Sequence, residues 1–266
     1  MLCTTVTHQD LPRLRELFAE ANDTPYDLVR VAEEKCFGRG VSGEPVVTIF
    51  GEFLGCAVTC GKYLRLLAVH RAHRRQGVAT QLLRDAYARG ARVVGAEGGN
   101  YFTPGAPMAL RGFFEKFGRK TAETQNLIAE TPLPARGERV AEGRVRGATR
   151  DRVLAFVRKE FGTIWHFEAA NARALHYVEH DKDIAGFAAH SANNKGLGFF
   201  GPTGVAKHLR GRGYGRALLL ASLADMRACG YEHAIIPWTD ALEFYKKSCG
   251  ATIHERFATF LLDSEP

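Results

Sequence analysis

The residues with the clearest chemical meaning lie between positions 199 and 229, where a glycine-rich turn joins an apolar run to a helix-forming segment. Arg210, Gly213 and Gly215 have the spacing R-x-x-G-x-G. The first N–H groups of a helix have no partners within the helix, and the helix dipole favours negative charge there. Glycine lets the backbone approach a phosphate because it has no Cβ. The stretch therefore predicts a site for an anion such as a phosphate group.

The same pattern occurs a second time, 136 residues earlier in the sequence. Arg74, Gly77 and Ala79 have the spacing R-x-x-G-x-A, again between an apolar run and a helix-forming segment. A glycine-rich turn alone is a weak signal, because it often serves only tight packing. Its repetition at a constant offset indicates a duplicated unit.

This strand–R-x-x-G-x-G/A–helix pattern resembles the acyl-coenzyme A signature of the GCN5-related N-acetyltransferases, the GNAT superfamily. Residues 241–250 (ALEFYKKSCG) and 110–118 (LRGFFEKFG) resemble the late helix of that superfamily. The sequence is thus similar to tandem GNAT proteins, and its C-terminal half resembles glucosamine and glucosaminide N-acetyltransferase-like proteins. The resemblance implies an α/β (α+β) fold in each half, with a mixed, mostly antiparallel sheet, a splayed strand pair and helices on both faces.

We expect two domains, an N-terminal one over residues 1–133 and a C-terminal one over 149–266. Residues 134–148 are rich in Pro, Gly and alternating charge, which is typical of a linker or an edge segment. The Gly/Pro-rich excursion 95–108 has no counterpart in the second half.

Local patterns predict the same order of elements in both halves, and each half is expected to close its sheet with its own last strand. In the first half we expect helices at 8–21, 26–37, 78–89 and 110–118, and strands at 45–50, 54–59, 63–69, 91–98 and 125–130. In the second half we expect helices at 150–161, after the glycine loop and at 241–250, and strands at 174–180, 184–191, 196–205, 232–238 and 252–262.

The resemblance implies that each glycine loop binds the pyrophosphate of acetyl-coenzyme A and that the strand before it binds the pantetheine arm. In the second half the implied binding residues are Thr203, Gly204, Val205, Arg210, Gly211, Arg212, Gly213, Tyr214, Gly215 and Arg216. In the first half they are Ala68, Val69, Arg74, Arg75, Gln76, Gly77, Val78 and Ala79.

The implied reaction is direct attack of a neutral amine on the thioester, with a tyrosine hydroxyl protonating the departing thiolate. Tyr245 stands where the superfamily places this acid, whereas the first half has Phe114, which cannot donate a proton. We therefore expect the second half to be catalytic. The first half would bind acyl-coenzyme A without strong catalysis or shape the substrate site.

The general base and the acceptor stay open. Asp240 and His190 are candidate bases, with Glu179 and His176 as alternatives, and Asp240 also suits the N-cap of the late helix. The acceptor is expected to be an amine of a small molecule or a peptide, and an amino sugar is one candidate. A non-catalytic acyl-coenzyme A-binding module is the alternative to an enzyme.

Composition limits the partners. A net charge of +7 favours acidic ligands such as coenzyme A, and the aromatic residues lie in apolar runs typical of core strands rather than among exposed arginines. We therefore expect no nucleic-acid partner.

The six cysteines form no zinc-like motif, so no metal is expected and the thiols are read as reduced. The lack of a membrane-spanning run or signal peptide favours a cytosolic protein without a membrane partner, and a homo-oligomer is compatible with the sequence.

Overall fold

The computed structural model describes residues 3–131 and 147–266, which form two compact units. Unit 1 comprises Met1–Thr124 and Arg256–Pro266, and unit 2 comprises Gln125–Glu255. Most of the predicted linker 134–148 lies outside the described residues, and only its last two positions fall within them. No helix among the described residues has both the length and the hydropathy needed to cross a lipid bilayer.

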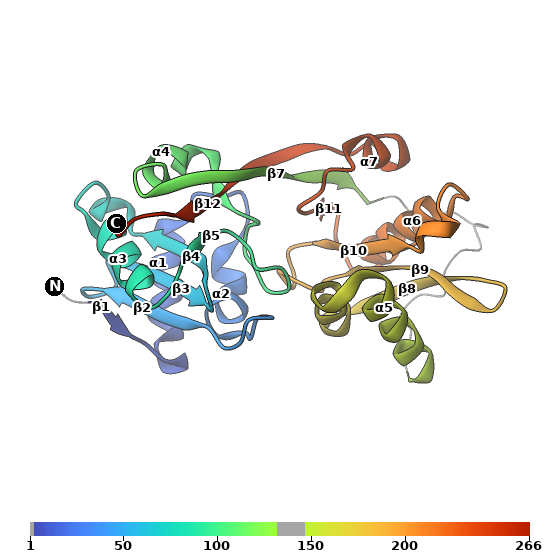
Figure 1. Cartoon of the computed structure of the whole chain (residues 1–266), viewed down its shortest axis with the longest axis horizontal. Helices are drawn as coiled ribbons and strands as arrows, with labels where there is room; N and C mark the ends of the chain where they lie inside the picture. Colours follow the sequence, from blue (N-terminus) through green and yellow to red (C-terminus); the bar gives the residue numbers. More distant parts are fainter. Residues whose placement is uncertain (1–2, 132–146) are drawn as a thin grey trace. The chain divides into compact units, whose positions relative to one another are not determined.

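Unit 1 is a mixed sheet with helices on both faces (Figure 1). Its strands follow the order β1-β2-β3-β4-β5-β12-β7. The elements are β1 (Cys3–Thr5), α1 (Leu11–Ala21), α2 (Leu28–Phe37), β2 (Val46–Phe50), β3 (Gly55–Cys60), β4 (Tyr63–Val69), α3 (Val78–Ala88), β5 (Val93–Val94), β6 (Ala106–Pro107), α4 (Arg111–Phe114), the start of β7 (Gly118–Glu130) and the end of β12 (Thr252–Leu262). Cys56 of β3 meets Cys36 of α2, whereas the next residue, Ala57, packs in the cluster that contains α3. Because successive strand side chains alternate, α2 and α3 cover opposite faces.

Unit 2 repeats this layered plan. Its elements are α5 (Ala148–Asn171), β8 (Ala174–His180), β9 (Asp183–His190), β10 (Phe200–Val205), α6 (Tyr214–Ala228), β11 (His233–Ile236) and α7 (Leu242–Cys249). Strands β10, β9 and β8 pair antiparallel in that order. Phe187 of β9 packs with α5, and its neighbour Ala188 packs with α6. The two helices therefore lie on opposite faces of this sheet.

The prediction that each half closes its own sheet is wrong. Leu127–Glu130 of β7 pair antiparallel with β11 inside unit 2, and Phe257–Leu261 of β12 pair with β5 and β6 inside unit 1. The two closing strands are thus exchanged. The patterns that predict a strand do not specify which of two similar sheets it joins, because both edges offer the same backbone hydrogen bonds.

Other elements also differ from the prediction. Helix α4 ends at Phe114, and β7 begins at Gly118 rather than at 125. Strand β5 is confined to Val93–Val94, because the glycines that follow turn the chain away. Helix α5 continues beyond the predicted end at Phe161, after a break at Gly162, whose φ of 86° and ψ of −171° lie outside the helical region.

The splayed strand pair implied by the resemblance is present in both units. In unit 1, β4 and β5 pair parallel at Tyr63–Leu64, and in unit 2 Phe199, the residue before β10, forms an isolated parallel bridge with Ile235 of β11. Each strand also carries a bulge before its splayed part, at Arg65 in β4 and at Gly201–Pro202 in β10. The bulges lie at the same offset as the glycine loops, so both units open the sheet at the same place.

Candidate functional site

The two glycine loops have the same backbone conformation. Gly77 and Gly213 are the N-caps of α3 and α6, with φ values of 82° and 86°. Two residues earlier, Arg75 and Gly211 are also left-handed, at 64° and 81°. A Cβ built at Gly77, Gly211 or Gly213 would meet no heavy atom within 4 Å. Both loops therefore present helix N-termini to open space large enough for a bound group.

The first arginine of each motif braces its loop. The Nε atoms of Arg74 and Arg210 donate to the carbonyl oxygens of Val69 and Val205, at 3.1 and 3.3 Å. Arg74 is held further by the carboxylate of Asp23, at 2.8 Å from its Nη1. Each arginine thus ties the loop to the end of the strand before it.

A pocket of about 500 Å³ adjoins the loop of unit 2 and is called the unit 2 donor pocket below. Its walls come from β10, the loop, the start of α6 and helix α7. Of the coenzyme-binding residues predicted for this half, all except Arg212 line it. The remaining lining residues are Phe161, Trp165, Leu209, Ala241, Phe244 and Tyr245.

Tyr245 lines this donor pocket from α7. Its ring packs edge-on against Phe200 and Phe244, with centroid distances of 6.3 and 5.0 Å, and the residue is 7% exposed. Burial raises the pKa of the Tyr245 hydroxyl well above its usual range. The hydroxyl is therefore protonated at neutral pH, as that of an ordinary tyrosine is.

Phe161 and Trp165 form an aromatic wall of the unit 2 donor pocket that the sequence analysis missed. Their rings stack at 5.0 Å and 21°. A Cβ at Gly204 would lie 2.5 Å from Cζ of Phe161, so only glycine allows this ring to lie against β10. The available signal in the sequence was the glycine at position 162, directly after Phe161, where the helix breaks.

The loop of unit 1 adjoins a pocket of about 350 Å³, the unit 1 donor pocket. Among the predicted residues of this half, Val69, Arg74, Arg75, Gly77, Val78 and Ala79 line it, whereas Ala68 and Gln76 do not. Phe114 lines this pocket, as Tyr245 does in unit 2.

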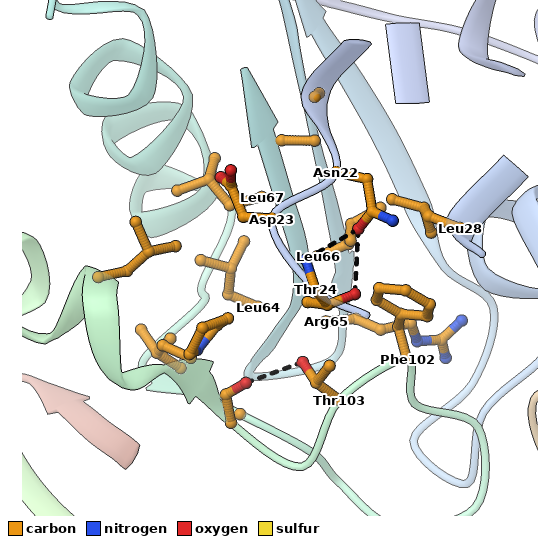
Figure 2. A pocket seen from close by; sticks show the side chains of 18 of the residues that line it. Asn22, Asp23, Thr24, Leu28, Leu64, Arg65, Leu66, Leu67, Phe102 and Thr103 are labelled. Atoms are coloured by element: carbon orange, nitrogen blue, oxygen red, sulfur yellow. Dashed lines mark hydrogen bonds between the residues drawn. The ribbon is translucent and has the colours of Figure 1, made fainter. Parts of the chain in front are cut away.

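A smaller pocket of about 70 Å³ lies beside β4 in unit 1, and Figure 2 shows it from close by. It shares Asp23, Leu67, Leu110 and Phe114 with the unit 1 donor pocket. Polar groups gather on one wall, where Asn22 Oδ1 accepts from Thr24 N–H at 3.2 Å. Phe102 and Thr103 come from the excursion 95–108 that has no counterpart in the second half. The excursion thus builds a wall of this pocket.

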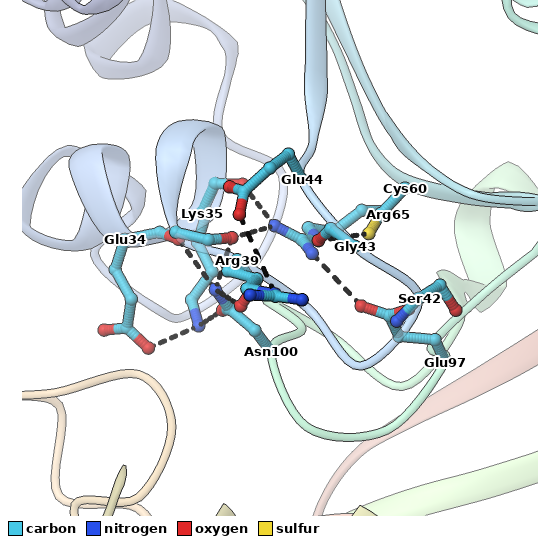
Figure 3. Close-up of polar contacts among 11 residues, drawn as sticks. Glu34, Lys35, Arg39, Ser42, Gly43, Glu44, Cys60, Arg65, Glu97 and Asn100 are labelled. Atoms are coloured by element: carbon cyan, nitrogen blue, oxygen red, sulfur yellow. Dashed lines mark hydrogen bonds and ion pairs between the residues drawn. The ribbon is translucent and has the colours of Figure 1, made fainter. Parts of the chain in front are cut away.

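Arg65, which lines this pocket, belongs to a network of charges drawn in Figure 3 that was not predicted from the sequence. The bulge in β4 turns Arg65 inward, where its Nη2 lies 3.1 Å from Glu97 Oε1, with both side chains at most 3% exposed. Lys35 Nζ donates to Asn100 Oδ1 at 2.8 Å and pairs with Glu34 at the same distance. Glu97 and Asn100 belong to the excursion, so these contacts fix it against α2 and β4.

None of the candidate bases is among the residues that line the three pockets described above. His190 is fully buried, with Nε2 at 2.8 Å from Asp225 Oδ2, and His176 is 2% exposed beside Ser222. Asp240 is exposed and is not the N-cap of α7. That position is Ala241, whose N–H donates to Thr239 Oγ1 at 3.1 Å.

Glu179, the remaining alternative, is paired with Arg152 at 3.1 Å. The structure does not bring any of these four residues to the lining of the unit 2 donor pocket.

Comparisons with protein families give one result for both halves. Residues 26–118 match the model of the acetyltransferase (GNAT) domain, and residues 147–251 match the model of the acetyltransferase (GNAT) family. Together the matches cover about three quarters of the chain. Among curated proteins, the sequence finds no relative.

Several solved structures share the fold across both units. A GCN5-related glucosamine N-acetyltransferase region of a fungal multi-domain GH3 β-N-acetylglucosaminidase aligns with a TM-score of 0.73 at 15% identity over 97% of this chain, which spans 38% of that protein. A GCN5-related N-acetyltransferase from Sphaerobacter thermophilus aligns at 0.63 with 17% identity, covering 97% of this chain and 94% of the other. A tandem GNAT protein from the clavulanic acid biosynthesis pathway aligns at 0.64 with 14% identity, over 97% of both chains.

Proposed function

Because the chain belongs to the GNAT family of acetyltransferases, with one such domain in each half, we propose that it is an acetyl-coenzyme A-dependent N-acetyltransferase. The acceptor is a primary amine of a small molecule or a peptide. The observation that carries the proposal is the unit 2 donor pocket, in which a glycine loop, a splayed strand and a buried tyrosine hydroxyl meet. We assign catalysis to this unit, and the cytosolic location inferred from the sequence is part of the same proposal.

The unit 2 loop suits a pyrophosphate. The space beyond Gly211 and Gly213 is open where a Cβ would point, and the N–H groups at the start of α6 face it. Arg212 and Arg216 are exposed beside these N–H groups and add positive charge. Thr203–Val205 line the pocket on the splayed part of β10, where backbone groups suit the amide groups of a pantetheine arm.

Acetyl-coenzyme A supplies the activated acetyl group as a thioester. A backbone N–H of splayed β10 binds the carbonyl oxygen and stabilises the negative charge that grows there as the amine nitrogen forms its bond to carbon. Tyr245 gives its hydroxyl proton to the sulfur as the carbon–sulfur bond breaks. The proton of the attacking amine passes to solvent water, and the Tyr245 phenolate takes a proton back from solvent.

Acceptor choice is guided by one structural relative. The fungal structure with the highest TM-score among those given above is described as a glucosamine N-acetyltransferase region. We therefore propose an amino sugar as the first acceptor to test, followed by aminoglycosides, polyamines and peptide N-termini.

Calorimetric titration of the full chain with acetyl-coenzyme A tests the proposal. We expect saturable binding, with one site lost in Gly213→Glu and any second site lost in Gly77→Glu, because a carboxylate would occupy the anion site. Gly230→Glu is the matched control, since Gly230 has a similar φ of 90° and open space but lies outside the pocket. An amine screen follows. Absence of binding in the unmodified protein would overturn the proposal.

Unit 1 supports a second candidate function, non-catalytic acyl-coenzyme A binding. Its loop has the same conformation as that of unit 2, but Phe114 lines its donor pocket and has no proton to donate. Two binding sites with turnover lost only in Gly213→Glu would assign this role to unit 1. Binding without turnover of any amine would extend it to the whole chain.

A further inference from the structure

A cluster of nitrogen, oxygen and sulfur ligand atoms lies in unit 2 between β9 and α6. His190, Asp225 and Cys229 each offer one such atom, and these three atoms lie within 4.8 Å of one another. None of the three residues lines the pockets described above. We propose that this cluster binds a zinc ion and that His176 completes the ligand set.

The fold brings the ligands together from three elements. His190 is the last residue of β9 and His176 lies on neighbouring β8. Asp225 lies in α6 and Cys229 caps its C-terminal end, four residues on, so both side chains project from the same face of the helix. Because the ligands come from separate elements, their spacing in the sequence does not form a recognisable metal-binding motif.

Two serines orient the imidazole rings. Ser191 Oγ lies 3.2 Å from Nδ1 of His190, and Ser222 Oγ lies 3.0 Å from Nδ1 of His176. Both rings therefore turn Nε2 toward the same carboxylate oxygen, Asp225 Oδ2, at 2.8 and 3.9 Å. A hydrogen-bond partner on the second ring nitrogen is the usual arrangement for histidines that bind metals.

Burial and charge favour a divalent cation. The two histidine side chains are at most 2% exposed, whereas the Asp225 side chain is 20% exposed and leaves a route from solvent. A bound cation would offset the negative charge of the Asp225 carboxylate and of the thiolate that Cys229 becomes on binding. Imidazole, thiolate and carboxylate together are the ligand types of tetrahedral zinc. On binding, the Cys229 thiol releases its proton to solvent as its sulfur bonds to the metal.

Cobalt(II) substitution gives a direct test on the full chain. After treatment with a chelator, the protein is titrated with Co²⁺ alone and then with Zn²⁺. We expect one equivalent of Co²⁺ with a near-ultraviolet thiolate-to-cobalt absorption band, its displacement by Zn²⁺, and a rise in the midpoint of thermal unfolding with either metal. Cys229→Ser is expected to lose the band. Cys249→Ser, which removes another half-buried thiol at the end of a helix in unit 2, is expected to keep it.

A second variant covers the case in which Cys229→Ser misfolds. Asp225→Asn keeps the shape of the side chain and a hydrogen bond to His190 while removing the charge, and we expect Co²⁺ affinity to fall at least about tenfold. A protein that shows no band and no thermal shift, or a band that depends on Cys249 rather than Cys229, would reduce the cluster to a hydrogen-bond network and overturn the proposal.

Discussion

Tyr245 and Phe114 occupy matching places in the two units, each on the helix that follows the splayed strands and each lining the pocket beside a glycine loop. We expect Tyr245→Phe to lower kcat by about 100-fold or more, the usual contribution of a general acid. The KM for acetyl-coenzyme A should change little, because the ring that packs against Phe200 remains. Steady-state kinetics with a responsive amine measures both constants.

Phe114→Tyr is the matched variant in unit 1. If catalysis belongs to unit 2, this added hydroxyl leaves turnover unchanged in a background that already carries Tyr245→Phe. Recovery of activity in that double variant would instead make unit 1 a competent site, and full activity of Tyr245→Phe alone would remove the acid role.

Gly204 is expected to be sensitive to a single added methyl group. A Cβ there would lie 2.5 Å from the Phe161 ring, and overpacking of this kind costs about 1–3 kcal/mol of unfolding free energy. Chemical denaturation of Gly204→Ala measures this loss. In the double variant with Phe161→Ala the clash is gone, so we expect the double variant to lose less unfolding free energy than the sum of the two single losses.

Gly215→Ala serves as control, because its Cβ would lie 3.6 Å from Phe244, an ordinary contact. Equal stability of the Gly204 and Gly215 variants would mean that Phe161 moves freely away from β10.

The buried pair of Arg65 and Glu97 predicts a large loss of stability on removal of one partner. Glu97→Ala leaves the guanidinium of Arg65 buried without its counter-charge, which typically costs about 3–5 kcal/mol. Glu44→Ala breaks the exposed pair with Arg39, and there we expect a loss below about 1 kcal/mol. Urea unfolding followed by circular dichroism compares the two variants, and similar midpoints would contradict the prediction.

Glu255 predicts a pH-dependent contribution to stability. Burial raises the pKa of this carboxyl from 4.5 to about 7, and its Oε2 has no hydrogen-bond partner in the part of the chain that the structure describes. The folded protein therefore binds this proton more tightly than the unfolded chain does. The stability that the protonated carboxyl contributes is complete below the pKa of the unfolded chain and is lost as the pH rises through about 7.

The carboxyl is half-exposed, so its effect is reduced by solvent. We expect Glu255→Gln to be nearly neutral at about pH 5 and more stable than the unmodified protein by about 1–2 kcal/mol at about pH 8. Denaturation at both pH values is the measurement, with the exposed Glu160→Gln as control. A difference that does not grow with pH would contradict the raised pKa.

Most individual elements could be predicted from the sequence because their signals are local. Apolar periodicity and the glycine loops located β4, α3 and α7 to within a few residues and placed α6 after its loop. Helix α4 is shorter than predicted. The partners of the closing strands could not be predicted, since the strand pattern of residues 125–130 suits either sheet. The pattern likewise does not reveal that helices cover both faces of β9, and His190, predicted as a candidate base, lies in the buried layer under α6.

The exchange of β7 and β12 makes the two copies inseparable. A gene fragment for either half alone would encode a sheet without its closing strand, and unpaired edges of that kind favour aggregation over function. The N-terminal half of the sequence is therefore needed even with Phe114 at the position of the acid, because deleting it would also remove Leu127–Glu130, which pair with β11 in unit 2. Each half of the duplicated sequence thus supplies the strand segment that completes the sheet of the other, whatever chemistry each supports.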